Sequence, residues 1–216
     1  MARRPVPSPR KSPRRRNAQQ TVDAILDAAA LLLESGNIDA LTTNKIAARA
    51  GVSIGSLYQY FPNREAIIRE LAARQWTRAA QRLAEAREQT EGMPFPAVAE
   101  ACVRVLASTA HGVATLRRAL LLEVPRAWIR PTVSGVHAAV VEQATILLRT
   151  YGEGPSASAE TRAFVLTHAV QGAVDAALVE HPEWFSDDAL LEAFVQDLTR
   201  MVVLHATTPP AVLGEA

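Results

Sequence analysis

The most specific chemistry in this sequence lies between positions 42 and 61, where two short amphipathic helices are predicted around a glycine. Thr42 and Ser53 stand where each helix begins, and their hydroxyls can accept a hydrogen bond from an unpaired backbone N–H. Gly51 separates the two helices and can take the left-handed conformation that ends the first one. Two helices joined by such a short turn form a helix-turn-helix, whose second helix enters the DNA major groove. The segment is therefore predicted to read DNA.

The outward face of the second helix supports this prediction. Leu57 and Phe61 lie four residues apart and form a narrow apolar stripe, while the remaining positions carry hydroxyl, amide and aromatic groups. Such groups suit base edges and phosphate oxygens. Gly55 weakens an isolated helix by roughly 1 kcal/mol relative to Ala, so it fits a close backbone approach to another molecule. The alternative, two ordinary helices of a bundle, leaves these features unexplained. The residues expected to contact DNA are Thr42, Thr43, Asn44, Lys45, Ser53, Ile54, Gly55, Ser56, Tyr58, Gln59, Tyr60 and Arg64.

From about Thr21 to Leu71 the sequence resembles the TetR/AcrR family of bacterial transcriptional regulators. The resemblance rests on a Thr-rich cap, Ile-Ala, Ala-Gly-Val-Ser, Leu-Tyr-x-Tyr-Phe and Asn-Arg-Glu, which follow one another in family order. It implies that Thr42, Thr43 and Asn44 touch DNA backbone and bases, and that the exposed positions from 53 to 60 form the recognition surface. It also implies that the remainder of the chain is helical and dimeric.

The resemblance also bears on two single positions, of which Ile54 departs from the family pattern. Arg64 stands where a lysine usually binds a phosphate at the start of the fourth helix. Ile54 stands where Lys, Arg, Gln or Pro is more usual, and its apolar side chain could only meet a thymine methyl or pack locally.

Composition indicates a globular protein. The chain has 216 residues, of which 49% are hydrophobic, and no apolar run reaches the roughly 18 residues that suggest a membrane span. The arginine-rich start lacks the apolar core of a secretory signal. Cys102 is the single cysteine, which fits a reducing cytoplasm, and its apolar neighbours favour a buried small hydrophobe over a redox sensor.

Charge is distributed unevenly along the chain. Residues 1–16 carry a charge of +7 and the remaining residues −6, although the whole chain is only +1. A basic segment rich in Pro and Ser is expected to be extended and disordered, and to meet a polyanion such as the DNA minor groove. A solvated tail that aids solubility, or part of an uncertain start site, is the alternative. The cations are Arg3, Arg4, Arg10, Lys11, Arg14, Arg15 and Arg16.

Hydrophobic periodicity predicts an all-helical chain without strands. Helices are expected over about 18–35, 64–87, 97–110, 115–124, 131–151, 157–180 and 187–205, besides the two short ones. The expected organisation is a basic arm over residues 1–16, a helix-turn-helix domain over 17–66, an effector-binding and dimerisation domain over 67–206, and a tail over 207–216.

The last two helices are predicted to form a homodimer interface. The first offers small residues that permit close helix approach, and the second offers large apolar side chains that fill grooves. Burial within one subunit is the alternative, but a twofold dimer would match a palindromic operator. The small residues are Ala163, Ala169, Gly172, Ala173, Ala176 and Ala177; the large ones are Leu190, Leu191, Phe194, Val195, Leu198, Met201 and Val202.

A small-molecule effector would occupy an apolar cavity with a few polar groups. Residues able to supply that chemistry are Cys102, His111, Arg118, Trp128, His137, Phe164, His168 and Gln171. For each of them, ordinary packing in a helical core is the alternative. Few cations occur in these helices, which favours an apolar or aromatic effector.

No catalytic, metal or cofactor site is predicted. The five histidines are never within a helical turn of one another, and neither a phosphate-binding glycine loop nor a nucleophile elbow is present. We therefore expect a cytoplasmic, ligand-responsive DNA-binding regulator, most simply a dimeric repressor, and not an enzyme. A helical ligand-binding or scaffold protein without sequence-specific DNA binding is the alternative.

Overall fold

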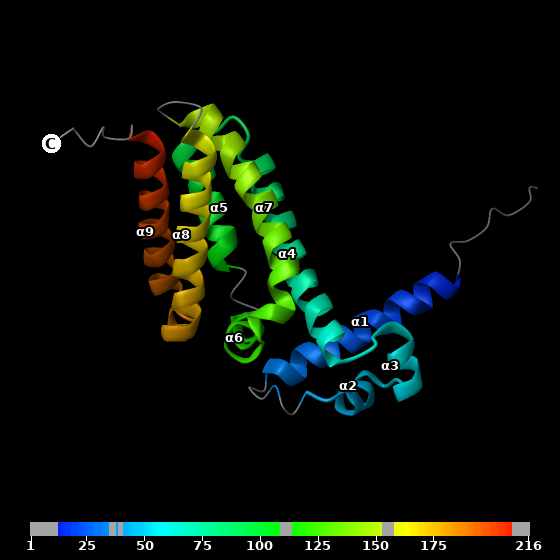
Figure 1. Cartoon of the computed structure of the whole chain (residues 1–216). Coiled ribbons are helices and arrows are strands. Elements are labelled where there is room, and N and C mark those ends of the chain that lie inside the picture. The colour runs from blue at the N-terminus through cyan, green and yellow to red at the C-terminus, as the bar shows by residue number, and fades with distance from the viewer. Residues whose placement is uncertain (1–12, 35–37, 39–40, 109–113, 153–157, 209–216) are drawn as a thin grey trace, which may run out of the picture. The chain divides into compact units, whose positions relative to one another are not determined.

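The computed structural model describes residues 13–34, 38, 41–108, 114–152 and 158–208, and every regular element in these ranges is a helix (Figure 1). The predicted all-helical class is confirmed. The chain divides into two compact units, residues 1–71 and 72–216. The boundary lies at Leu71 rather than at residue 66, since the fully buried side chains of Ile67, Ile68 and Leu71 belong to the first unit.

The first unit contains α1 (Pro13–Glu34), α2 (Thr43–Ala50), α3 (Ile54–Tyr60) and the first residues of α4 (Arg64–Gln89). Helix α2 packs against both α1 and α3. Fully buried apolar side chains from all four helices, and from the loop before α2, fill the core of the first unit. They include Ile25, Leu26, Leu33, Leu41, Ile46, Leu57, Ile67 and Ile68.

Helix α1 begins earlier than predicted. It starts at Pro13, so residues 13–16, which were expected to be extended, are helical. Proline is favoured at the first helical position, because its fixed φ suits the helix and its missing N–H is not needed there. The other residues of the predicted basic arm, 1–12, lie outside the described residues.

The second unit contains the rest of α4, followed by α5 (Phe95–Ser108), α6 (Ala114–Glu123), α7 (Arg126–Tyr151), α8 (Ala159–Glu180), the 3-10 helix η3 (Pro182–Phe185) and α9 (Asp188–Thr207). Helix α8 packs along α7 and also contacts α6, while α5 packs along α9 (Figure 1). One apolar cluster centres on Val174, Leu178 and Val195, and a second on Ala163 and Leu166. Among the described helices, none has the length and apolarity needed to cross a lipid bilayer.

The start of α7 differs from the prediction. The helix begins at Arg126, directly after Pro125, so Pro131 lies inside it instead of in its first turn. The backbone N–H of Trp128 donates to the carbonyl of Pro125 at 2.9 Å, which closes the first turn, and Ile129 is buried at 6% exposure. An internal proline costs a helix about 3 kcal/mol, and the burial of apolar side chains such as Ile129 offsets that cost.

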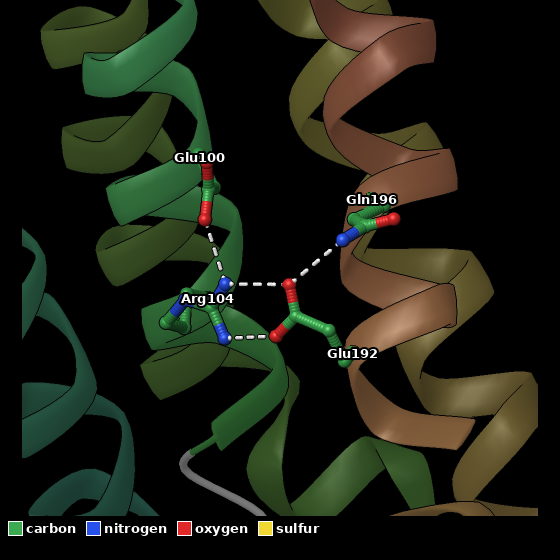
Figure 2. Close-up of polar contacts among 4 residues, drawn as sticks. All are labelled: Glu100, Arg104, Glu192 and Gln196. Carbon is green, nitrogen blue, oxygen red and sulfur yellow. Dashed lines mark hydrogen bonds and ion pairs between the residues drawn. The ribbon is translucent and has the colours of Figure 1, made fainter. Parts of the chain in front are cut away.

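Polar side chains also join helices of the second unit. Arg104 on α5 donates to both carboxylate oxygens of Glu192 on α9, at 2.7 and 3.1 Å, and to Glu100 at 2.6 Å (Figure 2). Gln196 donates to the same Glu192 at 3.1 Å (Figure 2). The hydrogen bond from Arg104 is the main reason that the pKa of Glu192 is lowered. Because the partners are about half exposed, this network fixes the register of α5 on α9 more than it adds stability.

A less exposed pair joins α6 to α8. Arg117 donates to Asp175 through Nε at 3.1 Å and Nη2 at 2.7 Å, with side-chain exposures of 14% and 32%. Gln171 donates to the same carboxylate oxygen at 2.9 Å.

Candidate DNA-binding surface and candidate ligand cavity

The helix-turn-helix is built by the caps that the sequence predicts. The Thr42 hydroxyl accepts from the backbone N–H of Lys45 at 3.3 Å, and the Ser53 hydroxyl accepts from that of Ser56 at 3.0 Å. Gly51 ends α2 in the left-handed region, with φ of 68°. Asn63 caps α4 by accepting from Ala66 at 2.8 Å. These local bonds fix where α2, α3 and α4 begin, and thereby which side chains face outwards.

The side chains expected to contact DNA are accessible on the first unit. Leu57 is fully buried, whereas Ile54, Tyr58 and Tyr60 are 38%, 52% and 37% exposed. Val52, in the turn between α2 and α3, is half-buried. Six other residues of the predicted set are exposed, and Thr43, Ser56 and Arg64 have intermediate exposure. These six are Thr42, Asn44, Lys45, Ser53, Gly55 and Gln59.

Two contacts organise this surface. The hydroxyls of Thr43 on α2 and Tyr58 on α3 lie 3.2 Å apart and share a hydrogen bond. Arg64 donates from Nη1 to the backbone carbonyl of Ile38 at 3.1 Å, so part of its guanidinium holds the segment between α1 and α2. A phosphate contact by Arg64 therefore has to use its other donors.

Gly55 has free space above it. A Cβ built at this position meets only the Ser53 Oγ, at 3.9 Å. Nothing within the protein therefore requires glycine here, and the reason for its presence must be sought outside the folded chain.

The second unit contains an apolar cavity of about 390 Å³. Helices α4, α5, α7 and α8 supply most of its walls, with Val202 of α9 added. Small and branched apolar side chains predominate, and Arg87 and Glu142 are the charged residues among its lining groups. The volume lies within the range of about 300–1,000 Å³ that small-molecule sites occupy.

Cys102 lines this cavity as a neutral thiol. Burial raises its pKa to about 11, and the nearby positive charge of Arg87 opposes that rise only in part. A thiol with such a pKa is protonated at neutral pH and is a poor nucleophile. Cys102 was expected to be a buried small hydrophobe, and the structure shows it partly buried in the cavity wall.

Residues 25–71 match the family model described as bacterial regulatory proteins, tetR family. This part of the chain is a tetR-family helix-turn-helix DNA-binding domain. The match covers the C-terminal part of α1 from residue 25 on, all of α2 and α3, and the start of α4, and it confirms the resemblance drawn from the sequence. No curated protein matches the sequence.

Solved structures of transcriptional regulators share the fold of the whole chain. A regulator from Rhodococcus sp. Rha1 is 19% identical, with a TM-score of 0.65, over 89% of this chain and 99% of the other. FadR from Bacillus halodurans is 17% identical, with a TM-score of 0.64, over 90% and 96%. FadR from Bacillus subtilis, solved in complex with stearoyl-CoA, is 20% identical, with a TM-score of 0.65, over 84% and 97%. The chain thus has the fold of these regulators.

The structure separates the residues that the sequence proposed for an effector. Cys102 lines the apolar cavity. His137, Phe164 and His168 line a second hollow of about 760 Å³ along α7 and α8. There the ring of His168 stacks on Phe164 at 4.1 Å and meets His137 edge-on at 5.7 Å. Burial, and next the charge of His168, lower the pKa of His137.

Three further candidates line neither hollow. Arg118 is exposed on α6, Trp128 is half-buried in the first turn of α7, and Gln171 is bonded to Asp175. His111 lies outside the described residues.

Sequence reasoning missed most of the cavity wall. Leu83 and Arg87 lie four residues apart on α4 and therefore face the same side, but this spacing alone does not distinguish a cavity wall from ordinary packing. An arginine on an otherwise apolar helical face was the available signal. The other missed lining residues are Ala80, Ala84, Phe95, Ala99, Val103, Leu106, Ala139, Val140, Glu142, Gln143, Ala144, Leu147, Leu148, Leu166, Thr167, Val170 and Val202.

Proposed function

We propose that this tetR-family transcriptional regulator is a ligand-responsive repressor, which binds a palindromic operator as a homodimer and is released by a small, mainly apolar effector. The observation that carries the proposal is the combination of an accessible, capped helix-turn-helix with an apolar cavity in the other unit. The first can hold DNA, and the second can hold the molecule that ends this binding.

Sequence-specific binding is supported by the chemistry of the outward face. Gln59 and Ser56 offer an amide and a hydroxyl for base edges, while Thr43 and Tyr58 offer hydroxyls for phosphate oxygens. Ile54 is exposed at 38% and does not pack into the core, which leaves it available to a thymine methyl.

Dimerisation is supported by apolar surface on the last two helices. Phe164 and Val165 on α8 are 54% and 48% exposed, and Leu190 and Leu204 on α9 are 44% and 57% exposed. Exposed apolar surface marks an interaction site where it is extensive, and we assign these side chains to such a site. Several of the predicted interface residues are instead buried within the subunit, namely Ala163, Ala177, Val195 and Leu198. The proposed interface is therefore the outward side of α8 and α9, including the exposed Ala169, Gly172, Ala176, Leu190 and Met201.

Effector control is supported by the cavity and by one structural neighbour. FadR from Bacillus subtilis was solved with stearoyl-CoA, so a regulator of this fold accommodates a ligand with a long apolar chain. Helix α4 supplies residues to both units, with Ile67 in the first and Leu83 and Arg87 at the cavity of the second. A ligand that displaces the cavity end of α4 would bias operator binding, and a coupling of about 1–3 kcal/mol changes affinity five- to 150-fold.

Fluorescence anisotropy with DNA that flanks the protein's own coding region tests the proposal. We expect one palindromic fragment to bind at least a thousandfold more tightly than a scrambled fragment of equal length, as is usual for specific DNA-binding proteins. Equal binding of both fragments at all salt concentrations would instead favour a helical ligand-binding or scaffold protein. Sedimentation velocity on the same sample measures whether the bound species is a dimer.

A further inference from the structure

Arg87 is an unusual residue in the wall of the apolar cavity. It lies in the last turns of α4, and its Nε is buried without a hydrogen-bond partner in the part of the chain that the structure describes. Buried polar groups are nearly always hydrogen-bonded, so an unpaired one needs an explanation. A guanidinium presents its donors as a planar fork that matches the two oxygens of a carboxylate. The unpaired Nε belongs to one edge of that fork.

Two groups that line the cavity could carry a negative charge and pair with Arg87, and neither does. The Cys102 thiol stays protonated at neutral pH, because burial raises its pKa to about 11. Glu142 also lines the cavity, but its side chain is exposed, and no ion pair joins it to Arg87 among the described residues. The positive charge inside the cavity is therefore left for a ligand.

We propose that the ligand of this cavity is a monocarboxylic acid with an apolar body, whose carboxylate pairs with the Arg87 fork. This inference rests on the proposed function only in taking the same cavity as the effector site. Apolar neighbours such as Leu83, Phe95 and Leu147 line the same cavity and would cover the body of the ligand. A carboxylate can form charge-assisted hydrogen bonds with the guanidinium fork, whereas the oxygen of an uncharged alcohol accepts only a weaker hydrogen bond from Nε.

The cavity volume limits the size of this acid. About 390 Å³ accommodates on the order of a dozen non-hydrogen atoms, if each takes roughly the 30 Å³ that one water molecule occupies in the liquid. A saturated acid of about ten carbons meets this limit, and we choose decanoate as the probe.

Isothermal titration calorimetry on the full-length protein compares decanoate with decanol and decylamine, which share its chain and differ in the head group. We expect decanoate to bind at least tenfold more tightly than decanol, and decylamine to bind most weakly. Arg87→Met should remove the preference for decanoate while it leaves decanol binding within about threefold. Arg87→Lys, which keeps the charge without the fork, should fall between them. Arg82→Met changes an exposed arginine of the same helix and should behave as the wild type.

Several outcomes would overturn the inference. Equal affinity for decanol and decanoate in the wild type would show that the head group is not read. Tightest binding of decylamine would assign the preference to Glu142 instead. A decanoate preference that survives in Arg87→Met would place the carboxylate elsewhere, provided that circular dichroism and unchanged decanol binding show the variant to be folded. If none of the three compounds binds, the cavity is not a site for such chains at all.

Operator binding, measured in parallel by anisotropy, separates this inference from the proposed function. Arg87-dependent decanoate binding without any change in operator affinity would support the ligand chemistry and contradict effector control. Release of the operator by decanol and decanoate at equal concentrations would do the reverse.

Discussion

The two units place their functional side chains in opposite positions. In the first, the residues proposed to act lie on the outer faces of α2 and α3, where a hydroxyl, an amide or an aromatic ring can be exchanged without opening the core. In the second, the proposed ligand site is enclosed by side chains that also hold helices together, such as Val103 and Val170, which are 3% exposed. A change on the outer faces of α2 and α3 should therefore alter DNA binding alone. A change in the cavity wall should alter ligand binding and stability together.

Gly172→Arg is expected to have the largest effect on DNA binding, although it lies in the second unit. A Cβ at Gly172 meets nothing within 4 Å, so the subunit can accept a side chain there. In the proposed dimer interface the arginine would block close approach of helices. Loss of bivalent binding should weaken operator affinity by about 10²–10⁴-fold, and sedimentation velocity should report a monomer.

A matched control for this variant is Gly135→Arg. Gly135 is also helical, exposed and free of neighbours within 4 Å, but it lies on α7. It should leave both the dimer and operator binding intact. A dimeric Gly172→Arg protein would refute the proposed interface. DNA binding would then depend on the surface of the first unit and not on this face of the second.

Tyr58→Ala should lower DNA affinity by about tenfold to a hundredfold, since a hydrogen bond to a charged group contributes roughly 1.5–3 kcal/mol. The loss should be equal for operator and scrambled DNA, because a phosphate contact carries no sequence information. Anisotropy on both fragments measures the ratio, and Tyr58→Phe separates the hydroxyl from the ring. Wild-type affinity in the Ala variant would show that the exposed hydroxyl does not contribute to DNA binding.

Gly55→Ala tests whether the size of the side chain at position 55 is restricted by bound DNA or by the protein itself. The added Cβ has room, so the free protein should become more stable by about 0.5–1 kcal/mol, as measured by urea unfolding. Operator affinity should nevertheless fall several-fold if the backbone of α3 approaches DNA closely. Gly135→Ala should show the stabilisation alone. Unchanged operator affinity in Gly55→Ala would mean that DNA does not come near this position.

The smallest expected effect concerns the pH dependence of stability in the second unit. Burial and the charge of His168 and Arg117 lower the pKa of His137, while Asp175 opposes them. The unfolded chain then binds the proton more readily than the folded one, so stability should decrease as the pH falls below the unfolded pKa of about 6.5. Urea unfolding at pH 7.5 and pH 5 should show a larger loss for the wild type than for His137→Gln. Identical losses would remove His137 from the pH response.

The DNA-binding unit could be predicted closely because its structure depends on neighbours in the sequence. Thr42, Gly51, Ser53 and Asn63 each act within three or four residues, and the structure places every one of them in the expected cap or turn. The match over residues 25–71 supports the same segment. Caps and turns can be predicted from the sequence because only a few residue types are strongly preferred at these positions.

The ligand cavity could not be predicted in the same way. Arg87 meets Phe95, Cys102 and Leu147 across three different helices, and no local rule states which faces will leave a space between them. The structure brings His137, Phe164 and His168 together around the second hollow, a grouping that the sequence did not predict. The cavity that Cys102 lines nevertheless excludes all three. The predicted start of α7 was wrong because both Pro125 and Pro131 could precede or begin a helix, and the sequence did not show which of them does.

The hydroxyl pair between Thr43 and Tyr58 has a consequence for the speed and selectivity of DNA encounters. A tyrosine that is already tethered to the neighbouring helix has lost much of its rotamer freedom when the chain folds, so less ordering remains to be done on the duplex. The two helices then meet DNA as one rigid template. A duplex whose groove is too wide or too narrow for this template would gain little from contact with it, so groove shape would be sensed before any base is read.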